Sequence, residues 1–183
     1  YSSVLLEVFW DISIYTTILS LEFAEVVTER IGKNVHRFIL KALPVLIIIG
    51  LIFPMMHQSS LGGLFLIAKS KMYPLWWSEF LPLYFLMSSF FVGSAMVCIE
   101  TELARRAYRH EIPTNVLKNL TRVGARIMAA YLALKLFDII AQGQVGLLFA
   151  GNMQSNMFLL ELFLGIIIPL GIIFSPYAKT RNG

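Results

Sequence analysis

Five long apolar stretches, separated by short polar segments, constrain this chain more than any other feature of its sequence. They cover about residues 3–26, 38–57, 80–100, 123–141 and 157–174. Each comes close to the roughly 20 helical residues that cross ~30 Å of hydrocarbon, and only helices satisfy their own backbone polar groups in lipid. The sequence therefore predicts an all-α transmembrane protein in which residues 1–183 form a single integral membrane region.

The composition favours the same class. Of the 183 residues, 57% are hydrophobic and 14% are charged, against about 25% charged in an average soluble domain. The basic residues lie in short runs between apolar stretches, which argues against nucleic acid as a partner and for membrane lipid. Cys98 is the single cysteine, so no disulfide framework and no iron–sulfur cluster held by this portion are expected.

The connecting segments predict the orientation. Lysines and arginines gather in the first and third connections and after the last apolar stretch, whereas the second connection holds only Lys69 and Lys71 and the fourth holds none. By the positive-inside rule, the second and fourth connections face the outside. The chain also begins without methionine, and we expect it to be an internal portion of a longer protein.

Three acidic residues of the first stretch lie on one face of the expected helix. Glu7 and Asp11 are one turn apart, and Glu22 returns to the same face eleven residues later. Such a stripe suits a path for protons, and it suits equally a set of salt bridges to helices outside this chain. Both interpretations predict that the stripe faces inward.

A second group of charged residues lies in the fourth and fifth stretches. Lys135 and Asp138 are spaced for an intrahelical pair, and Glu161 could partner Lys135 or Arg126 from the neighbouring helix. Structural pairing and proton relay both remain open for this group.

The run His57-Gln58-Ser59-Ser60 ends the second stretch and brings imidazole, amide and hydroxyl groups together. These groups could hydrogen-bond a quinone carbonyl and exchange its proton, or simply cap a helix end. The segment 59–79 is too irregular for a span, and Tyr73, Trp76 and Trp77 suit the membrane–water interface. No two of the three histidines are expected at matching depth, as a haem with two axial imidazoles requires.

The order of several motifs resembles the NrfD/polysulfide-reductase membrane-subunit family. The motifs are SVLLE, LEFAEVVTER, MMHQSSLGGLFL, YPLWW, LKLFD and FAGNMQSNMFLLE. Of these, HQSSLGGL is the most specific, and the closest branch is the membrane subunit of periplasm-facing uptake nickel–iron hydrogenases. The resemblance covers essentially the whole chain, as the central five of about ten helices.

The resemblance implies two four-helix bundles without haem and a quinone site near the periplasmic face. A four-cluster ferredoxin-like iron–sulfur subunit would dock on that face, together with hydrogenase or other catalytic subunits. It also implies proton transfer by Glu7, Glu22, Lys135 and Asp138. The family usually has arginine at the position of Lys135, and Asp11 is not one of its expected positions.

The sequence thus predicts a quinone-reactive subunit of a respiratory oxidoreductase in a bacterial or archaeal cytoplasmic membrane, rather than an enzyme alone. Menaquinone or ubiquinone would be its substrate, with linked proton uptake or translocation and no metal site. The expected quinone-binding residues are His57, Gln58, Ser60, Tyr73 and Trp76. The expected proton-transfer residues are Glu7, Asp11, Glu22, Lys135, Asp138 and Glu161. A secondary transporter or channel, and a purely structural anchor of a peripheral enzyme, are the alternatives.

Overall fold

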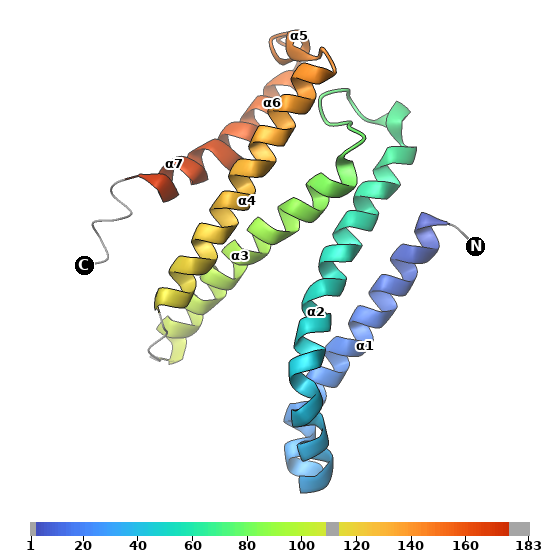
Figure 1. Cartoon of the computed structure of the whole chain (residues 1–183), viewed down its shortest axis with the longest axis vertical. Coiled ribbons are helices and arrows are strands. Elements are labelled where there is room, and N and C mark those ends of the chain that lie inside the picture. The colour runs from blue at the N-terminus through green and yellow to red at the C-terminus, as the bar shows by residue number, and fades with distance from the viewer. Residues whose placement is uncertain (1–2, 109–113, 176–183) are drawn as a thin grey trace.

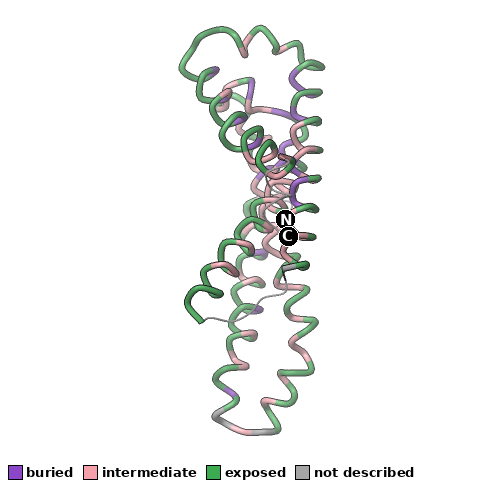
Figure 2. Tube along the Cα trace, turned by 90° about the vertical axis from the view of Figure 1, so that its left-hand side faces the viewer, coloured by how far each residue is buried: buried purple, intermediate pink, exposed green. Residues whose placement is uncertain are grey.

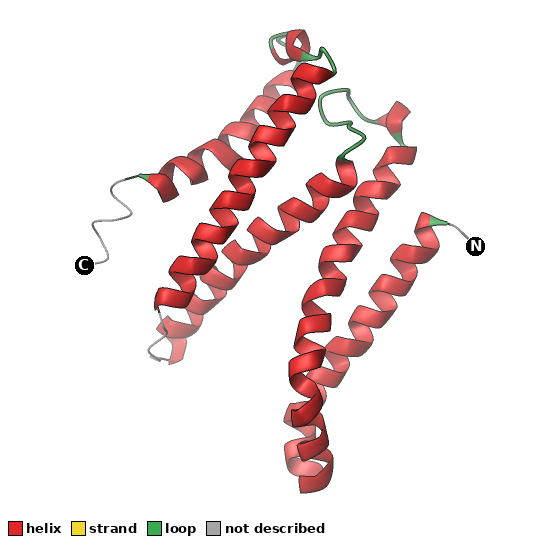
Figure 3. Cartoon of the chain, viewed as in Figure 1, coloured by secondary structure: helices red, strands yellow, loops and turns green. Residues whose placement is uncertain are grey.

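The computed structural model describes residues 3–108 and 114–175, and its regular elements there are all helical (Figures 1 and 3). In order they are α1 (Val4–Ile31), α2 (Lys33–Ile67), the 3-10 turn η1 (Lys69–Lys71), α3 (Leu81–Tyr108), α4 (Thr114–Ala141), α5 (Val145–Leu148), α6 (Met153–Leu162), the π-helical turn η2 (Phe163–Ile167) and α7 (Ile168–Phe174). The predicted all-α class is confirmed.

Helices that follow one another in the chain pack as antiparallel neighbours. α1 packs on α2, α2 on α3, and α3 on α4, while η2 and α7 pack on α4. Figure 1 shows the α1–α2 connection and the facing ends of α3 and α4 at the lower end of the molecule. The α2–α3 and α4–α6 connections lie at the upper end. The α1–α2 connection and the adjoining ends of α3 and α4 are therefore on the same side of the helical layer.

Three of the helical segments are long and apolar enough to cross a membrane, namely Asn34–Ile67, Leu81–Tyr108 and Met153–Phe174. α1 and α4 are as long as α3, at 28 residues each, but their apolar stretches are interrupted by more charged residues. Large apolar side chains face outward along most of the helices, for example Phe9, Phe23 and Phe137, which are 61%, 67% and 68% exposed. Such a surface needs lipid or further protein to cover it, and the chain is a multi-pass membrane protein.

The second helix is longer than the sequence indicates. α2 continues for ten residues beyond His57, so the first half of segment 59–79 is regular helix and the expectation of an irregular segment is wrong there. A Cβ atom at Gly62 would lie 2.7 Å from both the Leu81 carbonyl oxygen and the Pro82 Cα. The absence of a side chain at Gly62 therefore lets α2 pass directly against the start of α3, and this contact supports the extra helical turns.

The last span is a continuous helix with one irregular turn. The π-helical residues Phe163–Ile167 stand between α6 and α7, and Pro169 follows two residues later. Proline has no backbone N–H and its ring disturbs the preceding turn, which accounts for the local change in hydrogen bonding.

Buried residues are few and lie mainly toward the upper end (Figure 2). The core cluster consists of Leu75, Met128, Ile139, Phe158, Leu162 and Ile166. Leu75 comes from the connection between α2 and α3, and the others come from α4, α6 and η2. This connection therefore folds back onto α4 and α6 instead of lying apart from the helices.

Candidate functional site

Two clusters of polar side chains lie between the helices. The first, called here the Ser60 cluster, comprises Glu7, Asp11 and Ser60 and joins α1 to α2. The second, called the Lys135 cluster, comprises Tyr84, Lys135, Asp138 and Gln142 and joins α3 to α4.

The Ser60 cluster places one hydroxyl between two carboxylates. The Ser60 Oγ lies 3.1 Å from Glu7 Oε1 and 3.4 Å from Asp11 Oδ2. Asp11 is only 8% exposed, whereas Glu7 is exposed. No lysine, arginine or histidine forms an ion pair with either carboxylate among the residues that the structure describes. A hydroxyl has one proton to donate, so the two acids compete for it.

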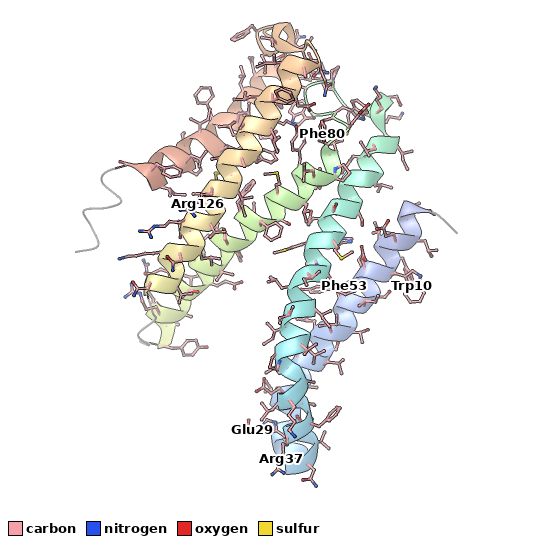
Figure 4. The ribbon with its side chains drawn as sticks, in the orientation of Figure 1. Trp10, Glu29, Arg37, Phe53, Phe80 and Arg126 are labelled. Carbon is pink, nitrogen blue, oxygen red and sulfur yellow. The ribbon has the colours of Figure 1, made fainter. Side chains whose placement is uncertain are left out.

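The acidic face of α1 turns toward α2, as predicted. Farther along the helix, a Cβ atom at Gly50 of α2 would lie 2.7 Å from Glu22 Oε1. Trp10 points away from α2 instead, and its side chain is 57% exposed (Figure 4). Glu7, Asp11 and Glu22 therefore share the inner face of α1 and border the interface with α2. The structure thus has the inward-facing stripe that both interpretations of these acids require.

His57 lies three residues before Ser60 on the same helix. Its Nδ1 atom is buried and has no hydrogen-bond partner among the residues that the structure describes. Gln58 is half-buried beside it. A buried imidazole nitrogen without a partner costs free energy, so this nitrogen is available to a ligand that can supply one.

The Lys135 cluster surrounds a buried amine with aromatic rings. Lys135 is 6% exposed, and its Nζ lies 4.9 Å from the ring centroid of Tyr84 and 5.6 Å from that of Phe158. Asp138 is 7% exposed and accepts a hydrogen bond of 2.9 Å from the Gln142 amide. The Tyr84 hydroxyl donates to the Leu134 carbonyl oxygen at 3.3 Å.

The expected pairing of charges does not form in the described part of the chain. Lys135 makes no ion pair there with Asp138 or Glu161, and Arg126 makes none with Glu161. The carboxylate of Asp138 bonds to Gln142 one turn later, and cation–π contacts hold the ammonium of Lys135.

Glu161 bonds to an indole. Trp76 Nε1 donates to Glu161 Oε2 at 2.7 Å, and the Trp76 ring packs edge-on against Phe158 with their centroids 5.5 Å apart. Tyr73 contacts Trp76 in the same way at 6.2 Å. The connection between α2 and α3 is thereby fixed to α6.

The predicted quinone residues divide between two places. His57, Gln58 and Ser60 lie on α2 beside α1. Tyr73 contacts Trp76 instead, and Trp76 contacts Glu161 and Phe158 near the Lys135 cluster. Sequence reasoning missed Tyr84 and Gln142. Gln142 stands four residues after Asp138, which is hydrogen-bonding spacing on a helix, whereas no local pattern marks Tyr84.

Comparison with known proteins adds one informative relative. The chain is 34% identical over 185 residues to the probable Ni/Fe-hydrogenase 2 b-type cytochrome subunit of Escherichia coli strain K12. The alignment covers 99% of this chain and 46% of that protein. This chain is similar to a hydrogenase membrane subunit. The similarity agrees with the hydrogenase part of the motif resemblance.

A second relative carries no functional name. It is a protein of Nitratidesulfovibrio vulgaris strain Hildenborough, 36% identical over 146 residues, which cover 75% of this chain and 38% of that protein. The chain therefore spans less than half the length of either relative. No protein-family model and no solved structure matches it.

The hydrogenase relative contradicts the expectation that no haem is bound, because a b-type cytochrome carries haem. The described residues offer His36 and His57 as axial ligands, and the Nδ1 atoms of both are buried without a partner. They stand 21 residues apart on α2, or about 30 Å along the helix, so they cannot ligate one iron together. The third histidine, His110, lies outside the described residues. A haem held by two histidines is therefore not formed by the part of the chain that the structure describes.

Proposed function

We propose that this chain is part of a membrane subunit of the NrfD/polysulfide-reductase type, which passes electrons between a hydrogenase-type partner and a membrane quinone. The similarity to a hydrogenase membrane subunit supports the electron-transfer role. The multi-pass helical fold supports the location in the lipid phase, where a quinone is dissolved. Menaquinone or ubiquinone would take up two electrons and two protons to become the quinol.

The Ser60 cluster beside His57 is the observation that carries this proposal. Ionisable side chains inside a membrane are costly and mark proton or substrate paths when no structural partner explains them. Asp11 is buried, and the described residues give it only the Ser60 hydroxyl as a hydrogen-bond partner. A quinone carbonyl placed near His57 would find a donor in the imidazole and a proton source in the two carboxylates.

The roles of the individual residues follow from their chemistry. His57 would donate a hydrogen bond to a quinone carbonyl oxygen, and Gln58 would help to orient the ring. Ser60 would pass a proton from Asp11 or Glu7 toward that site, because a hydroxyl can accept one proton while it donates another. Glu22 would continue the path along the α1–α2 interface. The redox chemistry itself belongs to the quinone.

The Lys135 cluster would provide a second proton path through Lys135, Asp138 and Glu161. Tyr73 and Trp76 would position Glu161 at its upper end rather than bind the quinone head group beside His57, because Trp76 already donates to Glu161. The Lys135 cluster lies near the Ala141 end of α4, on the side of the molecule that holds the α2–α3 connection.

The partner subunits would approach from that same end. The α2–α3 and α4–α6 connections contain few basic residues, which by the positive-inside rule favours the periplasmic side of a bacterial or archaeal cytoplasmic membrane. An iron–sulfur subunit docked there would deliver electrons close to His57.

Substitution of His57 by alanine in the full-length complex tests the proposal. We expect His57→Ala to lower quinone reduction at least tenfold in membranes while the subunits still assemble. His36→Ala is the matched control, because His36 is also on α2 with a buried, unpartnered Nδ1 atom but lies about 30 Å away. Unchanged quinone reduction in His57→Ala, or equal losses in both variants, would exclude the assigned role.

A further inference from the structure

One flank of α4 carries three basic side chains without partners in the described residues. Lys118, Arg122 and Arg126 follow one another at intervals of four residues, so they form a row about 12 Å long on one side of the helix. Arg122 and Arg126 are exposed, and Lys118 is half-buried. None of the three has an ion pair or hydrogen bond there. We call this row the basic flank of α4.

The basic residues at the end of α3, in contrast, have an acidic partner. Arg105 and Arg106 are both bonded to Glu102, at 2.7 and 2.8 Å. Their charges are thus partly compensated within their own helix. The basic flank of α4 has no such acid, although it lies at the same end of the molecule.

The position of Arg126 along α4 makes its lack of a partner significant. It is 12 residues, or about 18 Å, from the start of α4 and about 22 Å from its end. A helix that crosses ~30 Å of hydrocarbon from its Ala141 end would place Arg126 inside the hydrocarbon boundary and Arg122 close to it. An arginine there extends its guanidinium toward the head groups, where an anion lowers its cost. Figure 4 shows Arg126 on the outer side of α4, on the side toward which α7 diverges.

The surface beyond Arg126 on the same flank is apolar. Ala130, Ala133 and Phe137 continue the helical row from Arg126, and all three are exposed, Phe137 by 68%. Small alanines followed by an aromatic ring form a smooth apolar track directly next to the guanidinium groups. Head-group charge at one end and an apolar track along the membrane normal match the layout of a phospholipid.

We propose that the basic flank of α4 binds an anionic phospholipid, whose phosphate pairs with Arg122 and Arg126 and whose acyl chain lies along Ala130, Ala133 and Phe137. Guanidinium groups suit phosphate because they can donate two parallel hydrogen bonds. The apolar track that continues the row favours a lipid over a carboxylate from another helix, and the basic residues at this end favour an anionic head group.

The test uses the full-length subunit in lipid nanodiscs that contain spin-labelled phosphatidylglycerol or spin-labelled phosphatidylcholine. Electron paramagnetic resonance measures the fraction of each label that the protein immobilises. We expect the wild type to prefer phosphatidylglycerol and the double variant Arg122→Gln/Arg126→Gln to lose this preference, with roughly a fivefold weaker association for each arginine removed. Arg126→Lys should keep most of the preference, because it keeps the charge.

Arg105→Gln/Arg106→Gln is the control, since it removes the same charge from the same end of the molecule. The proposal predicts that this control retains the preference. Equal binding of the two lipids by the wild type, or an equal loss in both double variants, would overturn it. Loss of thermal stability in Arg126→Gln with an unchanged lipid preference would instead indicate a carboxylate partner on another helix, and would also overturn it.

Discussion

Trp76 and Glu161 are 85 residues apart in the chain and share a hydrogen bond of 2.7 Å from the indole nitrogen to the carboxylate. The bond ties the connection between α2 and α3 to α6. It also gives Glu161 a neutral donor instead of the cation that its sequence context suggests. The two halves of the molecule are therefore linked near its upper end by a contact that no local pattern specifies.

Loss of this hydrogen bond should destabilise the protein. Trp76→Phe keeps a ring against Phe158 but removes the donor to Glu161, and we expect a loss of about 1–2 kcal/mol, typical of hydrogen bonds to charged groups at partly exposed sites. Thermal unfolding of the full-length subunit, followed by circular dichroism, measures the change. Trp77→Phe is the control, because the Trp77 Nε1 atom has no partner to lose. An equal or larger effect of the control would contradict the assignment.

Gly62 and Gly63 should respond in opposite ways to alanine. At Gly62 a Cβ atom would meet the backbone of Leu81 and Pro82, which cannot move aside as a side chain can. We expect Gly62→Ala to separate α2 from α3 and to cost more than 2 kcal/mol, in the range of overpacked cores. Nothing lies within 4 Å of a Cβ atom at Gly63, so Gly63→Ala should be neutral or stabilise the helix by up to about 1 kcal/mol. Unfolding measurements on both variants would reveal this difference, and similar stabilities would contradict the close packing.

A substitution of Lys135 can distinguish a structural role of this residue from a role in proton transfer. Methionine has a similar length and no charge, and replacing a buried charge that lacks an ion pair by an apolar side chain is often close to neutral for stability. We expect Lys135→Met to keep its melting temperature within a few degrees but to slow proton-coupled quinone reduction by tenfold or more. A variant that unfolds readily yet, when folded, turns over normally would support a structural role alone.

The hydroxyl of Ser60 should contribute more to quinone reduction than the hydroxyl of Ser59. Ser60→Ala removes the only hydrogen-bond donor that the described residues provide to Glu7 and Asp11. We expect quinone reduction to fall about five- to tenfold while the complex still assembles. Ser59→Ala removes a hydroxyl that makes no hydrogen bond to these acids in the described structure, and it should have little effect. Steady-state assays on membranes of matched protein content decide the comparison, and parallel losses would argue against a proton path through Ser60.

The length of the apolar stretches was sufficient to predict the helical class, and helical periodicity was sufficient to predict the inner face of α1. Glu7, Asp11 and Glu22 recur at helical spacing, and helix geometry alone turns them to one side, so their common face could be predicted without knowing what they contact. The same reasoning set the end of α2 too early. The run from His57 to Gly63 resembles a helix end, and only the close approach of α3 explains why the helix continues through Gly62.

The side-chain contacts between different helices could not be predicted from the sequence of one helix. Lys135 and Asp138 have the correct spacing for a pair, but the amide of Gln142 and the rings of Tyr84 and Phe158 compete for them. Trp76 was expected at a quinone and bonds to Glu161. Such choices depend on which helices meet at which height, and the order of residues along one helix does not contain that information.

The length of α2 has a consequence for the thickness of membrane that the protein can occupy. Its 35 residues measure about 52 Å, whereas the hydrocarbon layer is about 30 Å thick. Immersing the whole helix would demand a tilt beyond the usual range of up to ~40°, so in an ordinary bilayer one or both of its ends protrude. Variation in bilayer thickness would then change how far these ends protrude, without straining the helix. The imidazole and hydroxyl groups at residues 57–60 stand about 10–15 Å before Ile67, so the level of this end of α2 in the bilayer sets the depth at which a hydrophobic substrate reaches them.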